Sequence, residues 1–230
     1  MKVSDSSVHN FKTMRYHAIL FDLDGTLLNT LRDLADAANH ALTAQGFPAH
    51  PVDAYRYFVG EGAQNLVTRA LPEAARTEAA IQRALALFRD AYAQNWNAHT
   101  RPYPGVPELL AALRARRLPL AVLSNKPNDF TQQCVHALLP DGEFACVFGQ
   151  REGVPRKPDP SGALEIAATL GVTPADVLYV GDSGIDMQAA RAAGMFPVGA
   201  LWGFRDKAEL LANGAQALIA RPEELLGLLA

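Results

Sequence analysis

The chain contains few cysteines and lacks long apolar or basic runs. Its 230 residues include two cysteines, Cys134 and Cys146, which form no CxxC pair, and six histidines that show no spacing typical of a metal site. We therefore expect both cysteines to be reduced core residues without a catalytic or metal-binding role. No apolar stretch is long enough to cross a bilayer, and the net charge of -3 comes from scattered charges of both signs. These absences argue against a membrane protein and against nucleic acid as the main partner.

The N-terminal segment is also unlike an export signal. Residues 1–14 are polar and have no apolar core, so we expect a polar lead-in and a cytoplasmic protein. The whole chain is 49% hydrophobic, which is enough for one large core or for a core with a smaller domain beside it. The sequence gives no information on oligomeric state.

Apolar runs alternate with amphipathic segments over the second half of the chain. A first strand is predicted at 17–21, directly before Asp22. After Pro102, helices are predicted between further strands at 120–123, 145–148, 177–180 and 198–201, with an edge strand at 217–219. This alternation predicts an α/β fold, a Rossmann-like doubly wound parallel sheet with helices on both faces. Ligands of such folds bind beyond the carboxyl ends of the strands.

Residues 31–100 show helical spacing without a convincing strand. Seventy residues exceed what a single crossover helix needs, and long connections are often functional insertions. We therefore predict a helical cap at 31–100, inserted after the first strand into a catalytic core made of 15–30 and 101–230.

Two carboxylates follow the first predicted strand, in the segment Asp22-Leu23-Asp24-Gly25-Thr26. Carboxylates held this close repel each other unless a cation or a shared proton offsets the charge, and Mg²⁺ prefers such oxygen ligands. Asp22 is then suited to attack phosphorus, and Asp24 to give a proton to the leaving oxygen and later take one from water. An isolated Asp-Gly would be read as an ordinary turn.

A second acidic pair and a lysine follow later strands. Asp182 and Asp186 lie one helical turn apart, where they suit either a metal site or helix capping. Lys157, held between Pro155 and Pro158, has the charge to neutralise a phosphoryl group, although a lone lysine is more often simply solvated.

Ser124 and Asn125 follow the strand at 120–123, where their polar groups suit phosphate oxygens or an ordinary strand-to-helix turn. Together, the predicted strand ends supply a nucleophile pair, a hydroxyl, a lysine and an acidic pair. These are the parts that phosphoryl transfer requires.

In these motifs the chain resembles the haloacid dehalogenase superfamily of phosphatases. FDLDGTLLNT (21–30), SNKP (124–127), RKPDP (156–160) and VGDSGIDMQAARAAG (180–194) match its four motifs, except that Asn29 stands where an aspartate is usual. The resemblance implies that Asp22 is the nucleophile and Asp24 the acid/base. It also implies Mg²⁺ held by the Asp22 side chain, the Asp24 backbone carbonyl and Asp182, with Asp186 in support. Ser124, Asn125 and Lys157 would bind phosphate.

Within that superfamily the chain is most similar to the phosphoglycolate phosphatase group, whose cap pattern resembles VGEGAQNLVTRAL (59–71). The resemblance implies a small phosphorylated metabolite as substrate, with phosphoglycolate first. Arg69 is one candidate in the cap for binding the substrate carboxylate, because arginine offers two parallel N–H donors; a surface role is the alternative.

Other functions remain open at this point. Amino-sugar phosphates and pyrophosphate are alternative substrates, and a sugar phosphomutase would share the motifs. A 2-haloacid dehalogenase displaces halide without needing a proton and lacks the second aspartate, so Asp24 argues against it. The intact nucleophile and metal residues argue against an idle phosphate-binding module.

Overall fold

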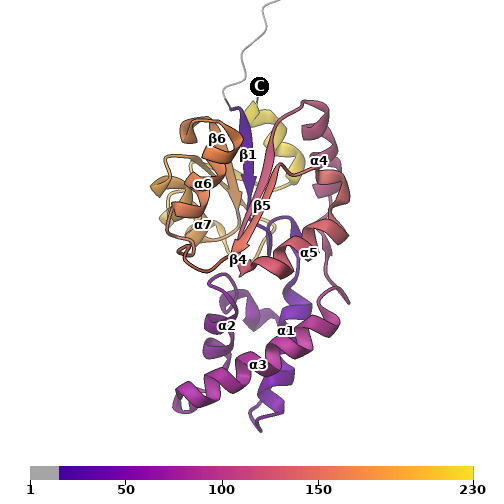
Figure 1. The fold of residues 1–230 in the computed structure, drawn as a ribbon, viewed down its shortest axis with the longest axis vertical. Helices are drawn as coiled ribbons and strands as arrows, with labels where there is room; N and C mark the ends of the chain where they lie inside the picture. Colours follow the sequence, from indigo (N-terminus) through magenta and orange to yellow (C-terminus); the bar gives the residue numbers. More distant parts are fainter. Residues whose placement is uncertain (1–15, 230) are drawn as a thin grey trace, which may run out of the picture.

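The computed structural model describes residues 16–229, and its centre is a six-stranded parallel sheet (Figure 1). The strand order is β5-β4-β1-β6-β7-β8. The strands are β1 Ala18–Phe21, β4 Leu120–Pro127, β5 Cys146–Gln150, β6 Val177–Gly181, β7 Phe196–Ala200 and β8 Ala217–Ile219. The predicted α/β fold class is confirmed. The chain leaves β1 toward β4 on one side and returns to β6 on the other, so β1 lies at the topological switch point where such sheets bind ligands.

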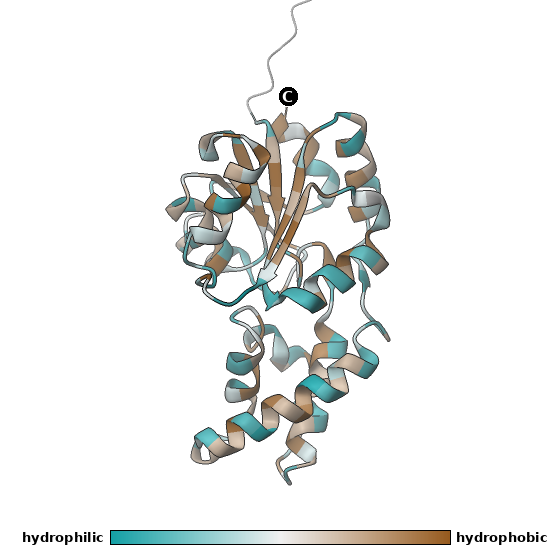
Figure 2. Cartoon of the chain, viewed as in Figure 1, coloured by the Kyte–Doolittle hydropathy of each residue, from teal (hydrophilic) through white to brown (hydrophobic). Residues whose placement is uncertain are grey.

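Alternate residues of β1 pack on opposite faces of the sheet. Ala18 and Leu20 pack into one apolar cluster with α6 (Ser161–Leu170) and α7 (Gly184–Ala192). Ile19 and Phe21 pack into the other. That second cluster includes α4 (Val106–Ala115), α5 (Asn128–Leu138) and the 3-10 helix Pro222–Leu229. All four β1 residues are buried, as expected for a parallel strand covered on both faces (Figure 2).

A helical insert, residues 31–100, lies beyond the carboxyl edge of the sheet (Figure 1). It contains α1 (Leu31–Thr43), α2 (Ala63–Ala70) and α3 (Glu78–Asn95), with 3-10 turns at Val52–Tyr57 and Glu73–Ala75. Its two ends are joined by a short antiparallel pair, β2 (Leu28–Asn29) with β3 (Arg101–Pro102). Whether the insert is a separate cap domain, as predicted, remains a proposal.

Asp33 on α1 ties down the returning end of the insert. Its buried carboxylate accepts hydrogen bonds from the backbone N–H groups of His99 and Thr100, at 2.9 and 2.8 Å, and from the Thr100 hydroxyl at 2.7 Å. Burial alone would raise the pKa of Asp33, but these hydrogen bonds outweigh it and hold the pKa below its ordinary value. The ionised carboxylate therefore stabilises the junction between insert and core.

Several element boundaries differ from those predicted. β4 runs to Pro127 rather than ending at 123, with an irregular register against β5, so Ser124 and Asn125 lie within the strand. β7 begins two residues earlier than the predicted 198–201. The short helix α8 (Lys207–Ala212), capped by the Asp206 side chain, was not predicted because it spans only six residues. The predicted lead-in, residues 1–14, lies outside the described residues.

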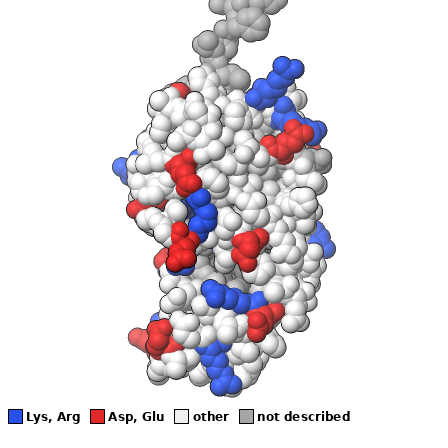
Figure 3. Space-filling model, in the orientation of Figure 1, with Lys and Arg blue, Asp and Glu red and all other residues white. Residues whose placement is uncertain are grey.

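Charged side chains on the face shown in Figure 3 are scattered, with acidic and basic groups interspersed. No helix in the described part of the chain is long and apolar enough to cross a membrane.

Candidate active site

Three buried carboxylates converge at the carboxyl edge of the sheet. Asp22 follows β1, Asp182 follows β6, and Asp186 lies in the first turn of α7; each offers an oxygen, and these oxygens lie within 4.8 Å of one another. Asp22, Asp182 and Asp186 are 8%, 1% and 0% exposed. The parallel pairing of β1 with β6 explains the convergence, because both strands end at the same edge.

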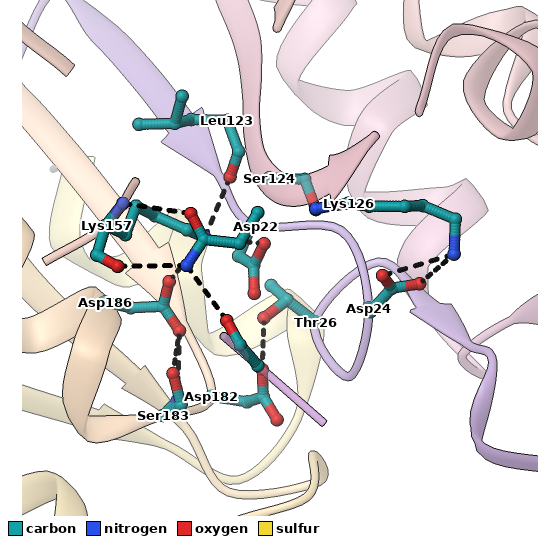
Figure 4. A network of polar contacts seen from close by, with 12 residues as sticks. Asp22, Asp24, Thr26, Leu123, Ser124, Lys126, Lys157, Asp182, Ser183 and Asp186 are labelled. Carbon is teal, nitrogen blue, oxygen red and sulfur yellow. Dashed lines mark hydrogen bonds and ion pairs between the residues drawn. The ribbon is translucent and has the colours of Figure 1, made fainter. Parts of the chain in front are cut away.

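Lys157 supplies a positive charge inside this cluster (Figure 4). Its Nζ lies 2.7 Å from Asp22 Oδ1 and 2.8 Å from Asp186 Oδ1, and it donates to the Leu123 carbonyl at 2.9 Å. Burial alone would lower the pKa of Lys157, but Asp186 and Asp22 outweigh it and hold the pKa well above its ordinary value. One ammonium group therefore pairs with two of the three carboxylates, Asp22 and Asp186, and the cluster keeps a surplus of negative charge when all three are ionised.

Burial and mutual repulsion raise the pKa values of two carboxyl groups in the cluster. Burial, reinforced by the charge of Asp186, raises the pKa of Asp22 well above its ordinary value. The same two causes raise the pKa of Asp182 from 3.8 to about 7. A buried cluster of this kind must hold protons or bind a cation. Oxygen donors alone suit a hard cation such as Mg²⁺, so the residues present fit a metal site.

Asp182 is fixed by two donors and by two glycines. The Thr26 hydroxyl donates to Asp182 Oδ1 at 3.1 Å, and the Phe204 N–H donates to Oδ2 at 2.7 Å. A Cβ at Gly25, where φ is +93°, would lie 2.3 Å from Asp182 Oδ2, and one at Gly203 would lie 2.2 Å from Asp182 Cβ. The site therefore requires glycine at both positions, which is the physical reason for the Gly in the DxDGT segment.

Asp186 belongs to a capping box as well as to the cluster. Its Oδ2 accepts hydrogen bonds from the Ser183 hydroxyl at 2.6 Å and the Ser183 N–H at 3.1 Å, while its Oδ1 faces Lys157. The two sequence interpretations of Asp186, helix capping and support of an acidic site, are thus compatible in one side chain.

Asp24 points away from the cluster toward Lys126 (Figure 4). Lys126 Nζ lies 3.1 Å from Asp24 Oδ1, and it donates to the Tyr92 hydroxyl of α3 at 2.7 Å. Burial alone would lower the pKa of Lys126, but Asp24 and Tyr92 outweigh it and keep the pKa above its ordinary value. The Asp24 side chain therefore takes no part in the carboxylate cluster, and it is bound to a lysine that also contacts the helical insert.

Sequence reasoning missed Lys126 and Tyr92. Lys126 lies inside the SNKP motif, where the sequence gives it no role, and Tyr92 lies in the segment 31–100, for which only helical spacing is predicted. The two residues are 34 positions apart, and no spacing rule connects them.

Asn125 and Ser124 are held by backbone partners. Asn125 Nδ2 donates to the carbonyls of Gly60 and Lys157, both at 3.0 Å, and its Oδ1 accepts from the Lys157 N–H at 2.9 Å. The Ser124 hydroxyl oxygen accepts from the Lys126 N–H at 3.2 Å. Asn125 thus holds the Lys157 loop and touches the insert; its predicted contact with phosphate, and that of Ser124, stay predictions.

A cavity of about 50 Å³ adjoins Asp22 and Asp24, between the sheet edge and the insert. Its acidic, basic and amide groups come mainly from the sheet edge, and its apolar groups mainly from the insert. The lining is Asp22, Asp24, Leu34, Val59, Gly60, Gly62, Ala63, Leu66, Phe88, Arg89, Tyr92, Ser124, Asn125, Lys126, Pro127 and Phe130.

Arg69 is not brought to this cavity. Its guanidinium pairs with Glu61 and faces the Phe58 carbonyl at 3.5 Å. Arg69 is not among the residues that line the cavity. The predicted contact of Arg69 with a substrate carboxylate therefore finds no support in its position.

Comparisons with known proteins agree with the motifs. A family model described as haloacid dehalogenase-like hydrolase matches residues 19–200. The phosphoglycolate phosphatase of Pseudomonas putida is 40% identical over 190 residues, covering 81% of this chain and 70% of that protein. The phosphoglycolate phosphatase of Aquifex aeolicus is 32% identical over 211 residues, covering 92% and 95%.

Solved structures give the same result. The crystal structure of a predicted phosphoglycolate phosphatase from Haemophilus somnus has a TM-score of 0.85 at 30% identity, covering 94% of this chain and 98% of that one. The resemblance inferred from the four motifs is confirmed.

Proposed function

Because the chain belongs to the haloacid dehalogenase-like hydrolase family, we propose that it is a Mg²⁺-dependent phosphatase that hydrolyses a small phosphate monoester through a phosphorylated Asp22. The observation that carries this proposal is the buried cluster of Asp22, Asp182 and Asp186 around Lys157, beside a small cavity. A nucleophile, a cation site and a fixed ammonium group in one place are the parts of a phosphoryl-transfer site.

Asp22 and Asp182 would hold the metal through their carboxylates, with the Asp24 backbone carbonyl as a third ligand; Asp186 would orient Lys157 and the metal's surroundings. When bound, Mg²⁺ would neutralise charge on the transferring phosphoryl group. Occupation of the site would also ionise Asp22 and Asp182, because a nearby cation lowers the pKa of a carboxyl group. Asp22 then carries the charge that a nucleophile needs.

In the first step, an Asp22 carboxylate oxygen forms a bond to phosphorus as the bond from phosphorus to the leaving oxygen breaks. Asp24 gives its proton to that leaving oxygen, which departs as an alcohol. Asp24 has to turn from Lys126 to do this, because its carboxylate is paired with Lys126 Nζ, 3.1 Å away. Lys157, 2.7 Å from Asp22, lies close enough to hold the phosphoryl oxygens.

In the second step, water attacks phosphorus and Asp24 takes the proton that this water loses. The bond from phosphorus to Asp22 breaks, inorganic phosphate leaves and the Asp22 carboxylate is restored. Residues of the insert line the cavity beside Asp22, so access of water, which accepts the phosphoryl group in this step, depends on the insert.

Phosphoglycolate is the substrate that we propose, as the names of the relatives suggest. Amino-sugar phosphatase and phosphomutase activities are second choices, because the names of the relatives suggest neither. Pyrophosphate remains an alternative substrate. A 2-haloacid dehalogenase would leave Asp24 without a use. A small soluble metabolite also agrees with the cytoplasmic location predicted from the sequence.

The direct test is phosphate release by purified protein from phosphoglycolate, amino-sugar phosphates, sugar monophosphates and pyrophosphate, with Mg²⁺ and after exhaustive chelation. We expect turnover only with the metal and fastest with phosphoglycolate. Asp22→Asn should remove essentially all turnover without unfolding the protein. Full activity after chelation, or appreciable activity in folded Asp22→Asn, would falsify the proposal. Preference for another ester would change only the substrate.

A further inference from the structure

The cavity beside Asp22 has two cationic residues in its lining, Lys126 and Arg89. Lys126 is already engaged by Asp24 and Tyr92. Arg89, an exposed residue of α3, has no ion-pair partner within 4.0 Å among the residues that the structure describes. Arg89 is therefore the lining cation that is available to a ligand.

A second cavity, of about 300 Å³, adjoins the first and shares with it Ala63, Arg89, Asn125 and Pro127. Two more arginines, Arg151 and Arg156, and the exposed Glu152 line this outer cavity. Arg151 is bound to Glu165 by two contacts of 2.9 and 2.6 Å and lies over the Phe148 ring.

Arg156 comes from the same loop as Lys157 and, like Arg89, pairs with no carboxylate in the described part of the chain. It lies next to Gly62, which lines the inner cavity: a Cβ at Gly62 would be 3.3 Å from Arg156 Nε. Two guanidinium groups without a carboxylate partner in the described part of the chain, Arg89 from the insert and Arg156 from the core, therefore line the outer cavity, and Arg89 also lines the inner one.

We propose that Arg89, assisted by Arg156, binds a carboxylate on the substrate and so selects phosphate esters that carry one. This inference rests on the proposed phosphatase function with phosphoglycolate as substrate, and it adds which residues recognise the carboxylate of that substrate. A guanidinium group presents parallel N–H donors that match both oxygens of a carboxylate. Arg69, bound to Glu61, is not free for this role.

The test compares phosphoglycolate with 2-hydroxyethyl phosphate, which has a similar size and an alkyl leaving group but no carboxylate. We expect wild-type protein to prefer phosphoglycolate in kcat/KM. Arg89→Met should lower that preference roughly 10- to 100-fold, because it removes a hydrogen bond between charged groups. Arg89→Lys, which keeps the charge but loses the paired donors, should fall between the two, and Arg156→Met should show a smaller loss of preference.

Arg83→Met is the matched control, because Arg83 is an exposed arginine of the same helix that lines neither cavity. It should leave the preference unchanged. An unchanged preference in Arg89→Met, equal losses on both esters, or a selective loss in Arg69→Met instead would each overturn the inference.

Release of nitrophenolate from p-nitrophenyl phosphate with Mg²⁺ separates the proposed phosphatase function from the proposed carboxylate site. If wild-type protein lacks this activity, the phosphatase function fails. If the activity is present but phosphoglycolate is not preferred, only the carboxylate site fails.

Discussion

Replacing Asp182 with asparagine in metal-free protein tests whether the cluster stores unfavourable negative charge. Asn has nearly the same shape but no charge. The Asp182 pKa is about 7 in the folded protein and 3.8 ordinarily, a difference worth on the order of 4 kcal/mol. Because the folded state holds this proton more tightly than the unfolded chain, the stabilisation is complete below about pH 4 and is lost as the pH rises through about 7.

The Asn variant lacks this pH dependence but has its own penalty. Its amide group can accept from only one of the two donors, Thr26 or Phe204, which costs about 1–3 kcal/mol at every pH. We therefore expect Asp182→Asn to be less stable than wild type in acid and to gain on it by roughly 3 kcal/mol toward pH 8. In a protein of this size the gap between the two melting temperatures should move by roughly 10 °C.

The assay is thermal unfolding followed by circular dichroism in chelator, at several pH values between about 5 and 8. Asp53→Asn is the control, since it makes the same change of side chain outside the cluster, at a position that is 88% exposed. Adding Mg²⁺ should raise the melting temperature of wild type and have little effect on Asp182→Asn. A gap between wild type and Asp182→Asn that stays constant with pH would refute the reasoning.

Two further predictions concern contacts of the insert. Tyr92→Phe removes the hydroxyl that accepts from Lys126, so the position of the Lys126–Asp24 pair should be less fixed. We expect turnover of phosphoglycolate to fall roughly tenfold, while the first-step release of nitrophenolate from p-nitrophenyl phosphate, whose leaving group needs no proton, should change little. Steady-state kinetics on phosphoglycolate and the pre-steady-state burst of nitrophenolate check this, and equal losses in the two would count against it. Asp33→Asn should lower the free energy of unfolding by about 1–3 kcal/mol at neutral pH, because the hydrogen bonds from Thr100 weaken. Since the pKa of Asp33 is lowered, the higher stability of wild type should vanish in acid as Asp33 protonates. Denaturant unfolding at neutral and at acidic pH measures this. Equal stability of the two proteins at neutral pH would contradict a stabilising role of Asp33 at the junction of insert and core.

The carboxylate cluster was predictable from the sequence because it is encoded locally. The apolar runs that became β1 and β6 are each closely followed by an aspartate, and parallel strands must end at the same edge of the sheet. Asp22 and Asp182 could therefore be placed side by side although 160 positions separate them. The need for Gly25 was not predictable in this way, because an Asp-Gly pair also suits a turn and the close contact with Asp182 is seen only in the structure.

Other features depend on contacts that no local pattern records. Tyr92 looked like any apolar residue of a helix, and its hydroxyl matters only because Lys126 arrives from β4. Arg69 has the chemistry to bind a carboxylate, and its helix α2 contributes to the cavity lining, but its guanidinium group is paired with Glu61. The position of Arg89 could not be predicted, because only the structure shows which face of α3 lines the two cavities. The residues proposed to set substrate specificity were thus less predictable from the sequence than those proposed to carry out the reaction.

Trapping the phosphorylated enzyme tests the central claim most directly. In Asp24→Asn the second step lacks its base, while p-nitrophenyl phosphate still allows the first step because its leaving group needs no acid. The account predicts a burst of about one nitrophenolate per protein molecule with Mg²⁺ and then near arrest. Acid quenching and borohydride reduction should then convert Asp22, and no other residue, to homoserine in the peptide mass map. No burst, or a phosphoryl group on a peptide without Asp22, would contradict the account.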